Sequence, residues 1–157
     1  MKLNKPWWKQ SKISIIVFSE NYASSRWCLD ELVHILKCKQ RYGRIVLPVF
    51  YEVDPSHVRK QEGSYGRAFG SHKKERRFKD KLLIWRDALS TAADLSGFDS
   101  KNYRTETELV ETIVNDILAK SKCNLSTIVT GLVGGESQIQ QIECCYALKH
   151  KMLNAAR

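Results

Sequence analysis

Residues 13–51 read ISIIVFSENYASSRWCLDELVHILKCKQRYGRIVLPVFY and place two apolar runs on either side of a helical pattern. The first run, residues 13–18, is short and mostly β-branched, which is typical of a strand covered on both faces. The second run, residues 44–51, is also apolar, although Pro48 removes a backbone donor and indicates an edge, a bulge or the strand's last pairs. Two such strands joined by a helix predict parallel pairing and a right-handed crossover.

The helix between these strands has a start signal and a stop signal in the sequence. Ser25 is placed to cap its first turn, apolar residues recur at helical spacing from Trp27, and Gly43 stands where the helix should end. In open parallel sheets, ligands bind beyond the carboxyl ends of the strands. The sequence therefore places a ligand site at residues 19–25 (SENYASS) and 52–58 (EVDPSHV).

The rest of the domain continues with helices. Ser56 is expected to cap a short helical turn, and the glycine-punctuated GSYGRAFG, residues 63–70, leads into another helix. A short last strand is expected at residues 95–98. A long core-facing helix comes before it, because its apolar residues are spaced by four, three, four and three: Phe78, Leu82, Trp85, Leu89 and Ala92.

The closing helix is predicted from Thr105, which forms a capping-box pattern with Glu108. Leu109, Ile113 and Ile117 then share one face, and the helix should end near residue 120. Beyond it, a Gly-rich break and a weakly apolar helical pattern indicate a linker. GLVGG, residues 131–135, is not a phosphate loop, because no Gly-Lys-Ser/Thr follows it.

Length and composition restrict the class of protein. A chain of 157 residues, 43% hydrophobic, is the size of one domain with one core. No apolar stretch approaches the roughly 20 residues that cross a bilayer, and the N-terminus lacks the apolar region of a secretory signal. We expect a cytoplasmic protein, with the nucleus as a second location, and no membrane partner. The five cysteines should be thiols, and no metal site is predicted from their spacing.

The formal net charge is +9, and residues 73–86 contribute much of it. A concentrated basic stripe can follow a phosphate backbone or an acidic partner. Aromatic residues that would stack on bases are nearly absent there, because Phe78 and Trp85 are needed for the core. We interpret the stripe as the solvated face of a helix and expect no nucleic-acid partner.

Two adjacent acids, Asp30 and Glu31, lie in the first turns of the helix that starts near Ser25. Trp27 and Glu31 are four residues apart and share a face, so an indole and a carboxylate could receive a flat cationic ligand. Asp30 lies about 100° around the helix and is expected to be solvated. On pattern alone, an acid at this position commonly serves the helix dipole, so the catalytic interpretation stays open.

Hydrolase chemistry based on the nearby serines is not supported, because the chain has no G-x-S-x-G elbow. His34 falls in mid-helix and His57 in a loop, and both are interpreted as ordinary histidines.

Three separate stretches together resemble the plant Toll/interleukin-1 receptor (TIR) domain of nucleotide-binding leucine-rich-repeat immune receptors. They are SKISIIVFSENYASSRWCLDELVHIL (residues 11–36), VLPVFYEVDPSHVRKQEGSYGRAF (residues 46–69) and WRDALSTAADLSGF (residues 85–98). The resemblance runs from residue 11 to about residue 120. It implies an α/β fold with a flavodoxin-like parallel sheet and flanking helices, and a role in plant disease-resistance signalling.

The resemblance also implies an activity, hydrolysis of NAD+ at the nicotinamide–ribose bond, as an NAD+ nucleosidase of the ADP-ribosyl cyclase and cyclic ADP-ribose hydrolase type. NAD+ is then the substrate, and no separate cofactor is implied. The glutamate of the family's W-C-L-x-E-L motif, the catalytic residue, falls on Glu31, and Trp27, Ser25 and Arg26 would line the substrate. The family's self-association surface falls on Gly63 and Gly66, so other TIR domains are the implied partners.

The chain departs from the family pattern at its N-terminus. The first strand-helix-strand portion expected of a complete TIR domain does not precede residue 11. We therefore expect an atypical segment at residues 1–10, a partial TIR domain at 11–120, and at 121–157 a linker and the start of the connector to a nucleotide-binding domain. Two hypotheses remain: an enzyme that cleaves NAD+ through Glu31, and a non-catalytic module that pairs with full-length TIR receptors.

Overall fold

The computed structural model describes residues 12–125 of the chain, which divide into two compact units between Arg104 and Thr105. The second unit holds α5 (Glu106–Leu125). In its described part, the first unit holds three strands and four helices, with 3-10 turns at Tyr22–Ser24, Arg76–Phe78 and Ser100–Asn102. In chain order they are β1 (Ile13–Phe18), α1 (Arg26–Tyr42), β2 (Ile45–Phe50), α2 (Pro55–Lys60), α3 (Gly63–Lys74), α4 (Lys79–Ala93) and β3 (Phe98–Asp99).

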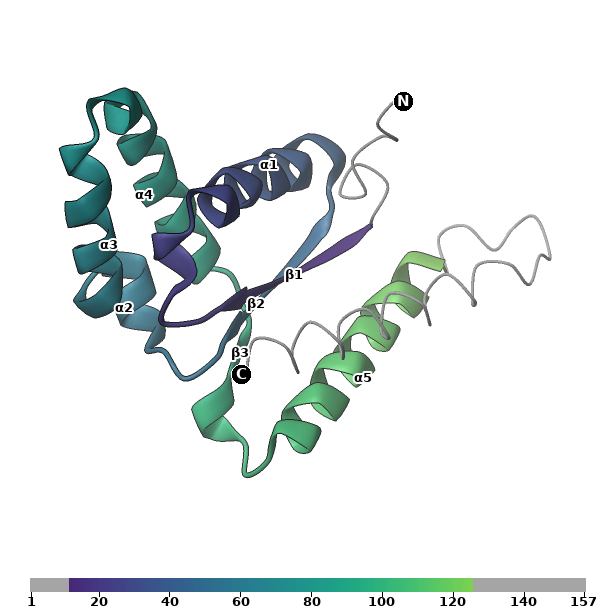
Figure 1. Cartoon of the computed structure of the whole chain (residues 1–157). Coiled ribbons are helices and arrows are strands. Elements are labelled where there is room, and N and C mark those ends of the chain that lie inside the picture. Colours follow the sequence, from purple (N-terminus) through teal and green to yellow (C-terminus); the bar gives the residue numbers. More distant parts are fainter. Residues whose placement is uncertain (1–11, 126–157) are drawn as a thin grey trace, which may run out of the picture. The chain divides into compact units, whose positions relative to one another are not determined.

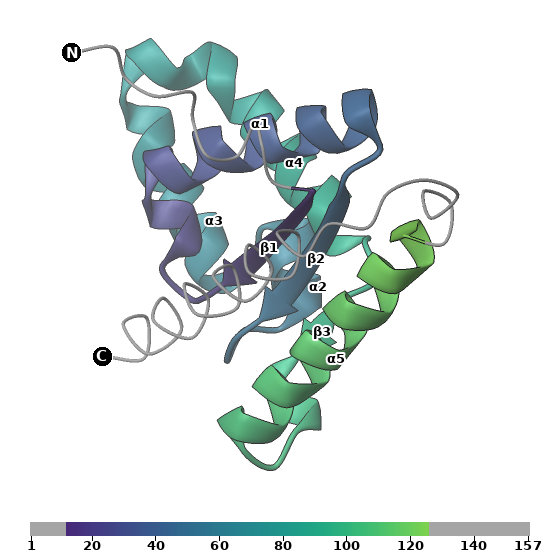
Figure 2. The same cartoon turned by 90° about the vertical axis from the view of Figure 1, so that its right-hand side faces the viewer.

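The described strands form one parallel sheet in the order β1-β2-β3 (Figure 1). The register pairs Ile13 with Ile45 and Phe18 with Phe50, so β1, α1 and β2 make the predicted parallel strand-helix-strand unit. Helices α1 and α4 lie side by side over one face of this sheet, as Figures 1 and 2 both show. The predicted α/β class with a parallel sheet and flanking helices is confirmed.

Strand β1 is buried on one face only, whereas the sequence predicted burial on both. Ser14, Ile16 and Phe18 are buried, and the alternate residues from Ile13 to Val17 are only half-buried. Within the described residues, β1 pairs with β2 alone, so it is the outermost strand of the described sheet. By contrast, β2 lies between two strands and is buried continuously from Val46 to Phe50.

Pro48 lies in the middle strand without costing a ladder bond. The Ile45 N–H donates to the Lys12 carbonyl just before β1, and the Tyr51 N–H donates to the Phe18 carbonyl of β1. Backbone N–H groups alternate in direction along a strand, so the nitrogen of Pro48 faces β3. Strand β3 pairs only with Val49 and Phe50, so its ladder begins after Pro48. The three predicted placements, an edge, a bulge or the strand's last pairs, are not observed, because β2 is the middle strand and Pro48 pairs with Ile16 in unbroken register before the Val49 and Phe50 pairs.

The last strand is β3 at Phe98–Asp99, not residues 95–98 as predicted. Leu95 still donates its N–H to Ala92 and so continues the end of α4. Gly97 lies directly on Pro48, because a Cβ added there would come within 2.2 Å of the Pro48 carbonyl oxygen. This close contact requires a glycine and delays pairing until Phe98.

The predicted caps of α1 are confirmed. The Ser25 hydroxyl oxygen accepts a hydrogen bond from the Cys28 N–H at 3.3 Å. At the other end Gly43 has a left-handed φ of 63°, and its N–H donates to the Lys39 carbonyl. Both signals act within one turn of chain, which is why they could be recognised in the sequence.

The cap of α2 is Asp54 and not Ser56, so that expectation was wrong. A carboxylate oxygen of Asp54 accepts from the Ser56 N–H at 2.8 Å, and Pro55 occupies the first helical position. Proline needs no N–H partner there, so the cap falls on the residue before it. The stretch GSYGRAFG does not precede a helix but forms the first two turns of α3.

The predicted core-facing stripe of α4 is confirmed. Trp85, Leu89 and Ala92 are buried, and Phe78 and Leu82 pack against the core at its edge. The largest fully buried side chains of the first unit come from the sheet and from α1, α3 and α4: Phe18, Leu29, Leu32, Tyr65, Phe69, Trp85 and Leu89.

Helix α5 forms the described part of the second unit. The Thr105 hydroxyl accepts from the Glu108 N–H at 3.1 Å, as the capping pattern predicted. Leu109 and Ile113 are buried, and the helix continues to Leu125 instead of ending near residue 120. No helix among the described residues is long and apolar enough to cross a membrane. The expected linker and connector at 121–157 lie almost entirely outside the described residues.

Candidate functional site

Two buried side chains of α3 form hydrogen bonds with backbone carbonyls of the loop between β1 and α1. The Tyr65 hydroxyl donates to the Ser19 carbonyl at 2.9 Å, and His72 Nε2 lies 2.9 Å from the Ala23 carbonyl. Because a carbonyl oxygen can only accept, Nε2 carries the proton of His72. Tyr65 is fully buried and His72 nearly so, so both hydrogen bonds are shielded from water. The loop at the carboxyl end of β1 therefore has a fixed path into α1.

Asp30 ties α1 to α4. One carboxylate oxygen accepts from Trp85 Nε1 at 3.0 Å, and the other accepts from Lys81 Nζ at 2.9 Å. Burial acts to raise the pKa of Asp30, but the hydrogen bonds from Lys81 and Trp85 outweigh it and hold the pKa below its ordinary value of 3.8. The Asp30 side chain is 43% exposed, in keeping with the expectation that it is solvated, but its hydrogen bonds to Trp85 and Lys81 of the neighbouring helix were not predicted.

Glu31 lies on a different side of α1 and has no such partner. Its side chain is half-buried and makes no hydrogen bond or ion pair with any residue that the structure describes. The negative charge of Glu31 is felt at Tyr22, whose hydroxyl donates to the Cys28 carbonyl at 3.2 Å. Burial raises the pKa of Tyr22 most, and the charges of Cys28 and Glu31 raise it further.

Trp27 lies one turn before Glu31, and 76% of it is exposed. The two side chains share a face of α1 as the spacing predicted, and this face carries an open indole next to an unpaired carboxylate.

Ser25 and Arg26 both have structural partners. The Ser25 oxygen caps α1, as described above. Arg26 Nη1 donates to Glu75 Oε2 at 3.0 Å, and its guanidinium carbon lies 4.7 Å from the centre of the Phe78 ring. These two contacts hold the Arg26 side chain near the start of α4. Its charge is therefore paired with Glu75 and is not free to bind a ligand.

Gly63 and Gly66 stand at the start of α3, where the backbone conformation favours glycine at the first position and close packing leaves little room for a Cβ at the second. Gly63 has a left-handed φ of 58°. A Cβ on Gly66 would lie 2.9 Å from the Gln61 carbonyl oxygen in the turn between α2 and α3. These glycines therefore have a reason within the fold, separate from the self-association that the resemblance implies.

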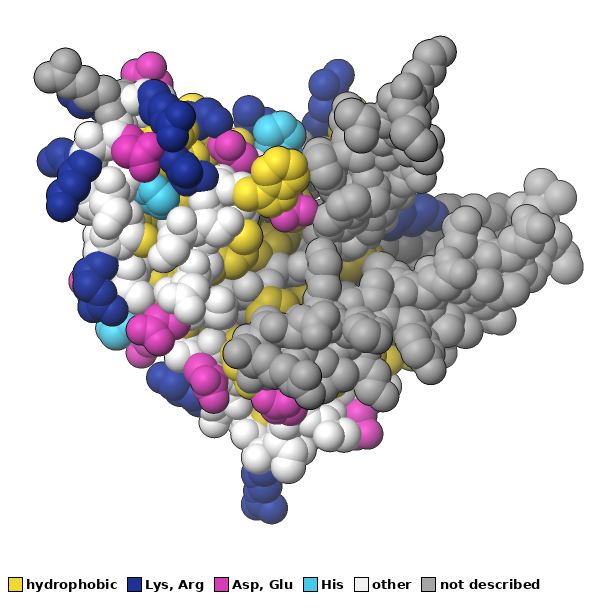
Figure 3. Space-filling view, viewed as in Figure 1, with side chains coloured by type: hydrophobic (Ala, Val, Ile, Leu, Met, Phe, Trp, Pro, Cys, Tyr) yellow, Lys and Arg dark blue, Asp and Glu magenta, His cyan; other side chains and the backbone are white. Residues whose placement is uncertain are grey.

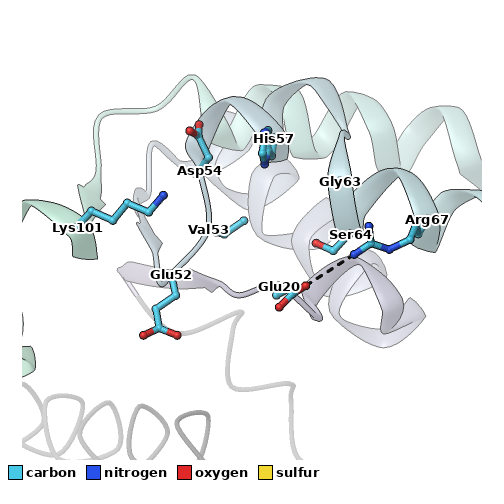
Figure 4. Close-up of a pocket in the computed structure, with 9 residues that line it drawn as sticks. All are labelled: Glu20, Glu52, Val53, Asp54, His57, Gly63, Ser64, Arg67 and Lys101. Atoms are coloured by element: carbon cyan, nitrogen blue, oxygen red, sulfur yellow. Dashed lines mark ion pairs between the residues drawn. The ribbon is translucent and has the colours of Figure 1, made fainter.

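A shallow depression of about 410 Å³ lies at the carboxyl ends of the strands (Figure 4). Both loops predicted to carry a ligand site contribute to it, the first through Glu20 and the second through Glu52, Asp54 and His57. Lys101, which follows β3, was not predicted, although the same rule applied to a third strand would have found it. The complete lining is Glu20, Glu52, Val53, Asp54, His57, Gly63, Ser64, Arg67 and Lys101.

The charges around this depression are mixed and exposed. Arg67 forms a long ion pair with Glu20 at 3.8 Å, drawn as a dashed line in Figure 4, and both side chains are more than two thirds exposed. Glu31 and Trp27 do not line the depression. The predicted catalytic residue and the hollow at the carboxyl ends are thus separate features of the first unit.

The basic segment at residues 73–86 covers the end of α3 and the start of α4. Lys and Arg side chains gather over this part of the molecule in Figure 3. Several of them are used within the fold: Lys81 binds Asp30, and Arg77 binds Glu75 at 3.1 Å. For the other basic side chains of this segment, we keep the interpretation that they form the solvated face of a helix.

Comparison with known proteins places this arrangement in a family. Residues 7–135 match the TIR domain. The chain is 48% identical over 134 residues to disease resistance protein RPV1 of Vitis rotundifolia, and 42% identical over 139 residues to TMV resistance protein N of Nicotiana glutinosa. These matches cover 85% and 86% of this chain but only 9% and 12% of those proteins.

A solved structure agrees with these matches. The TIR domains of the activated Roq1 resistosome, which directly recognises the pathogen effector XopQ, superpose with a TM-score of 0.67 at 41% identity. The match covers 74% of this chain and 76% of that one. Taken with the parallel sheet and the family match along most of its length, this shows that the chain belongs to the TIR domain family.

Proposed function

We propose that the chain is a signalling TIR domain of the plant disease-resistance type and that it hydrolyses NAD+ at the nicotinamide–ribose bond through Glu31. The observation that supports this most is the contrast between the two adjacent acids. Asp30 is occupied by Trp85 and Lys81, whereas Glu31 has no partner among the described residues and stands beside the exposed Trp27. A carboxylate left unpaired next to an open aromatic ring is available to a cationic ligand.

The chemistry suits one carboxylate. Breaking the bond between the ribose C1′ and the nicotinamide nitrogen leaves both bonding electrons on nicotinamide, which departs as a neutral molecule and needs no general acid. The positive charge then develops on the ribose ring, where the Glu31 carboxylate can stabilise it and bind a ribose hydroxyl. Water adds at C1′ and releases a proton, giving ADP-ribose. The Trp27 indole would stack on the flat nicotinamide before it leaves.

Nicotinamide release from NAD+ by the purified chain tests this function. Glu31→Gln keeps the shape and removes the charge, so we expect release to fall by about a hundredfold or more. Glu111→Gln, an exposed acid on α5, is the matched control and should release nicotinamide like the unaltered chain. Equal activity of Glu31→Gln and the unaltered chain would remove Glu31 from the mechanism.

A non-catalytic interaction module is the second candidate, and one observation favours it. Ser25 and Arg26 are committed to the helix cap and to Glu75, so two of the three side chains expected around a substrate have structural partners. Under this alternative the chain would bind other TIR domains and release no nicotinamide at any concentration.

Co-purification with a second TIR domain distinguishes this alternative. Binding should survive Glu31→Gln and weaken in Gly70→Arg. Gly70 is the suitable probe of the α3 surface, because a Cβ there meets nothing within 4 Å, whereas Gly66→Arg would also disturb the turn before α3. Loss of binding in Glu31→Gln with Gly70→Arg unaffected would argue against this candidate.

A further inference from the structure

The outward side of α4 carries an exposed apolar residue between charges of opposite sign. Leu83 is 76% exposed and the neighbouring Ile84 is 50% exposed, although the other side of this helix contributes to the core. With 3.6 residues per turn, Lys79 and Arg86 lie roughly 40° to 60° to one side of Leu83. Asp80 and Asp87 lie at similar angles on the other side. We call these pairs the basic row and the acidic row.

Neither row forms an ion pair within the part of the chain that the structure describes. All four side chains are exposed. Arg86 only stacks its guanidinium over the Phe69 ring at 5.2 Å. Lys81, on the inward side of the same helix, is by contrast held by Asp30. The outer face of α4 therefore presents unpaired charges around an apolar centre.

We propose that the outer face of α4 is a self-association surface and that its occupant is the α4 of a second copy of this chain, packed in parallel. The occupant follows from the symmetry of the charges. A two-fold axis parallel to the helices keeps each residue at its height and exchanges left and right, so the basic row meets the acidic row of the second copy.

Residues at matching heights then pair across this contact. Lys79 faces Asp80 of the second copy, Arg86 faces its Asp87, and both pairs recur by symmetry while the two Leu83 side chains meet at the centre. An antiparallel arrangement would keep left and right unchanged and set acid against acid and base against base. The charge pattern thus selects both the partner and its direction.

The contact is expected to be weak and reversible. One helix pair with exposed ion pairs belongs to the small, transient class of interfaces. Two copies that each carry a net charge of +9 also repel at long range, which moderate salt reduces. This contact does not depend on Glu31, so association and nicotinamide release succeed or fail separately.

Sedimentation velocity of the full chain over a range of concentrations tests the surface at about 0.1 M ionic strength, where the Debye length is about 10 Å. The unaltered chain should show concentration-dependent dimers. The double variant D80K/D87K makes both rows basic, and K79E/R86E makes both rows acidic, so each should associate about tenfold or more weakly. Mixed in equal amounts, the two variants should form a heterodimer.

Two further variants keep the result interpretable. Leu83→Ser alters an exposed side chain without touching the core and should also weaken dimerisation. K73E/K74E changes charge by the same amount at the end of α3 and should leave it unchanged. A monomeric unaltered chain, dimers that persist in both charge variants, or variants that fail to pair when mixed would overturn the assignment, and the outer face would then belong to a different protein partner.

Discussion

Asp30 and Glu31 are neighbours in the chain but differ in what surrounds them. The phase of the helix, which can be read from spacing, separates their directions by about 100°. It could not reveal which of them is occupied, because the partners of Asp30 are 51 and 55 residues away in the chain. The sequence therefore singled out Glu31 as a candidate through Trp27 and the family motif, and did not predict the structural use of Asp30.

Asp30→Asn should lower the free energy of unfolding at pH 7 by about 1 to 2 kcal/mol, because it removes the charge that Trp85 and Lys81 bind. The estimate stays below the full value for charged hydrogen bonds because the Asp30 side chain is 43% exposed. Urea unfolding measures the difference, and Asp87→Asn, which loses no ion pair in the described structure, should change little.

The same substitution has a defined pH dependence. The folded pKa of Asp30 lies below its ordinary 3.8, so its stabilisation is present above that value and is lost as pH falls through the folded pKa. The unaltered chain and Asp30→Asn should therefore converge in stability below pH 3.8. A difference that persisted unchanged in acid would contradict the assigned role of the ionised carboxylate.

At the scale of elements, signals that act locally were predictable and pairings between distant segments were not. The caps of α1 and the capping of α5 by Thr105 depend on residues within a turn, and both were predicted. The start of β3 depends on the close contact between Gly97 and Pro48. These residues are far apart in the sequence, so no local pattern could predict where β3 begins. The cap of α2 was misassigned by two residues because Asp54 and Ser56 are both good caps, and Pro55 decides between them.

Helix α3 offers a matched pair of glycines for testing these local constraints. Gly70→Ala should raise the free energy of unfolding by about 0.5 to 1 kcal/mol, because alanine favours the helix and the added Cβ meets nothing within 4 Å. Gly66→Ala should lower it by about 1 to 2 kcal/mol, because its Cβ would press on the Gln61 carbonyl. Thermal unfolding of both variants measures the two changes in stability. Stabilisation in both variants would mean that the turn before α3 relaxes to accept the Cβ at residue 66.

At the scale of the molecule, the sequence predicted the class, the parallel sheet and the approximate ligand end, because strand-helix-strand units permit few topologies. It could not predict that β1 is buried on one face only, since that depends on which segments, distant in the chain, pack over each face of the sheet. The depression at the carboxyl ends was anticipated through its two loops, but its separation from Glu31 emerges only when α1 is placed in space.

The excess of positive charge gives a prediction for the whole chain. With a net charge of +9 at pH 7 and an isoelectric point near 9.4, copies repel one another at neutral pH and lose that repulsion in mild alkali. Turbidity at fixed concentration should therefore peak near pH 9.4 and fall on either side. A peak near neutral pH would instead point to association driven by a local surface.

The way α3 holds the loop before α1 also affects which residues can change during evolution. Tyr65 and His72 bind the carbonyls of Ser19 and Ala23, and every residue type has a carbonyl. The exposed side chains of the same loop, Glu20, Asn21 and Ser24, contribute nothing to these two bonds. The surface beside Trp27 can thus vary in sequence while Glu31 keeps its place, so new recognition properties can arise there without rebuilding the fold.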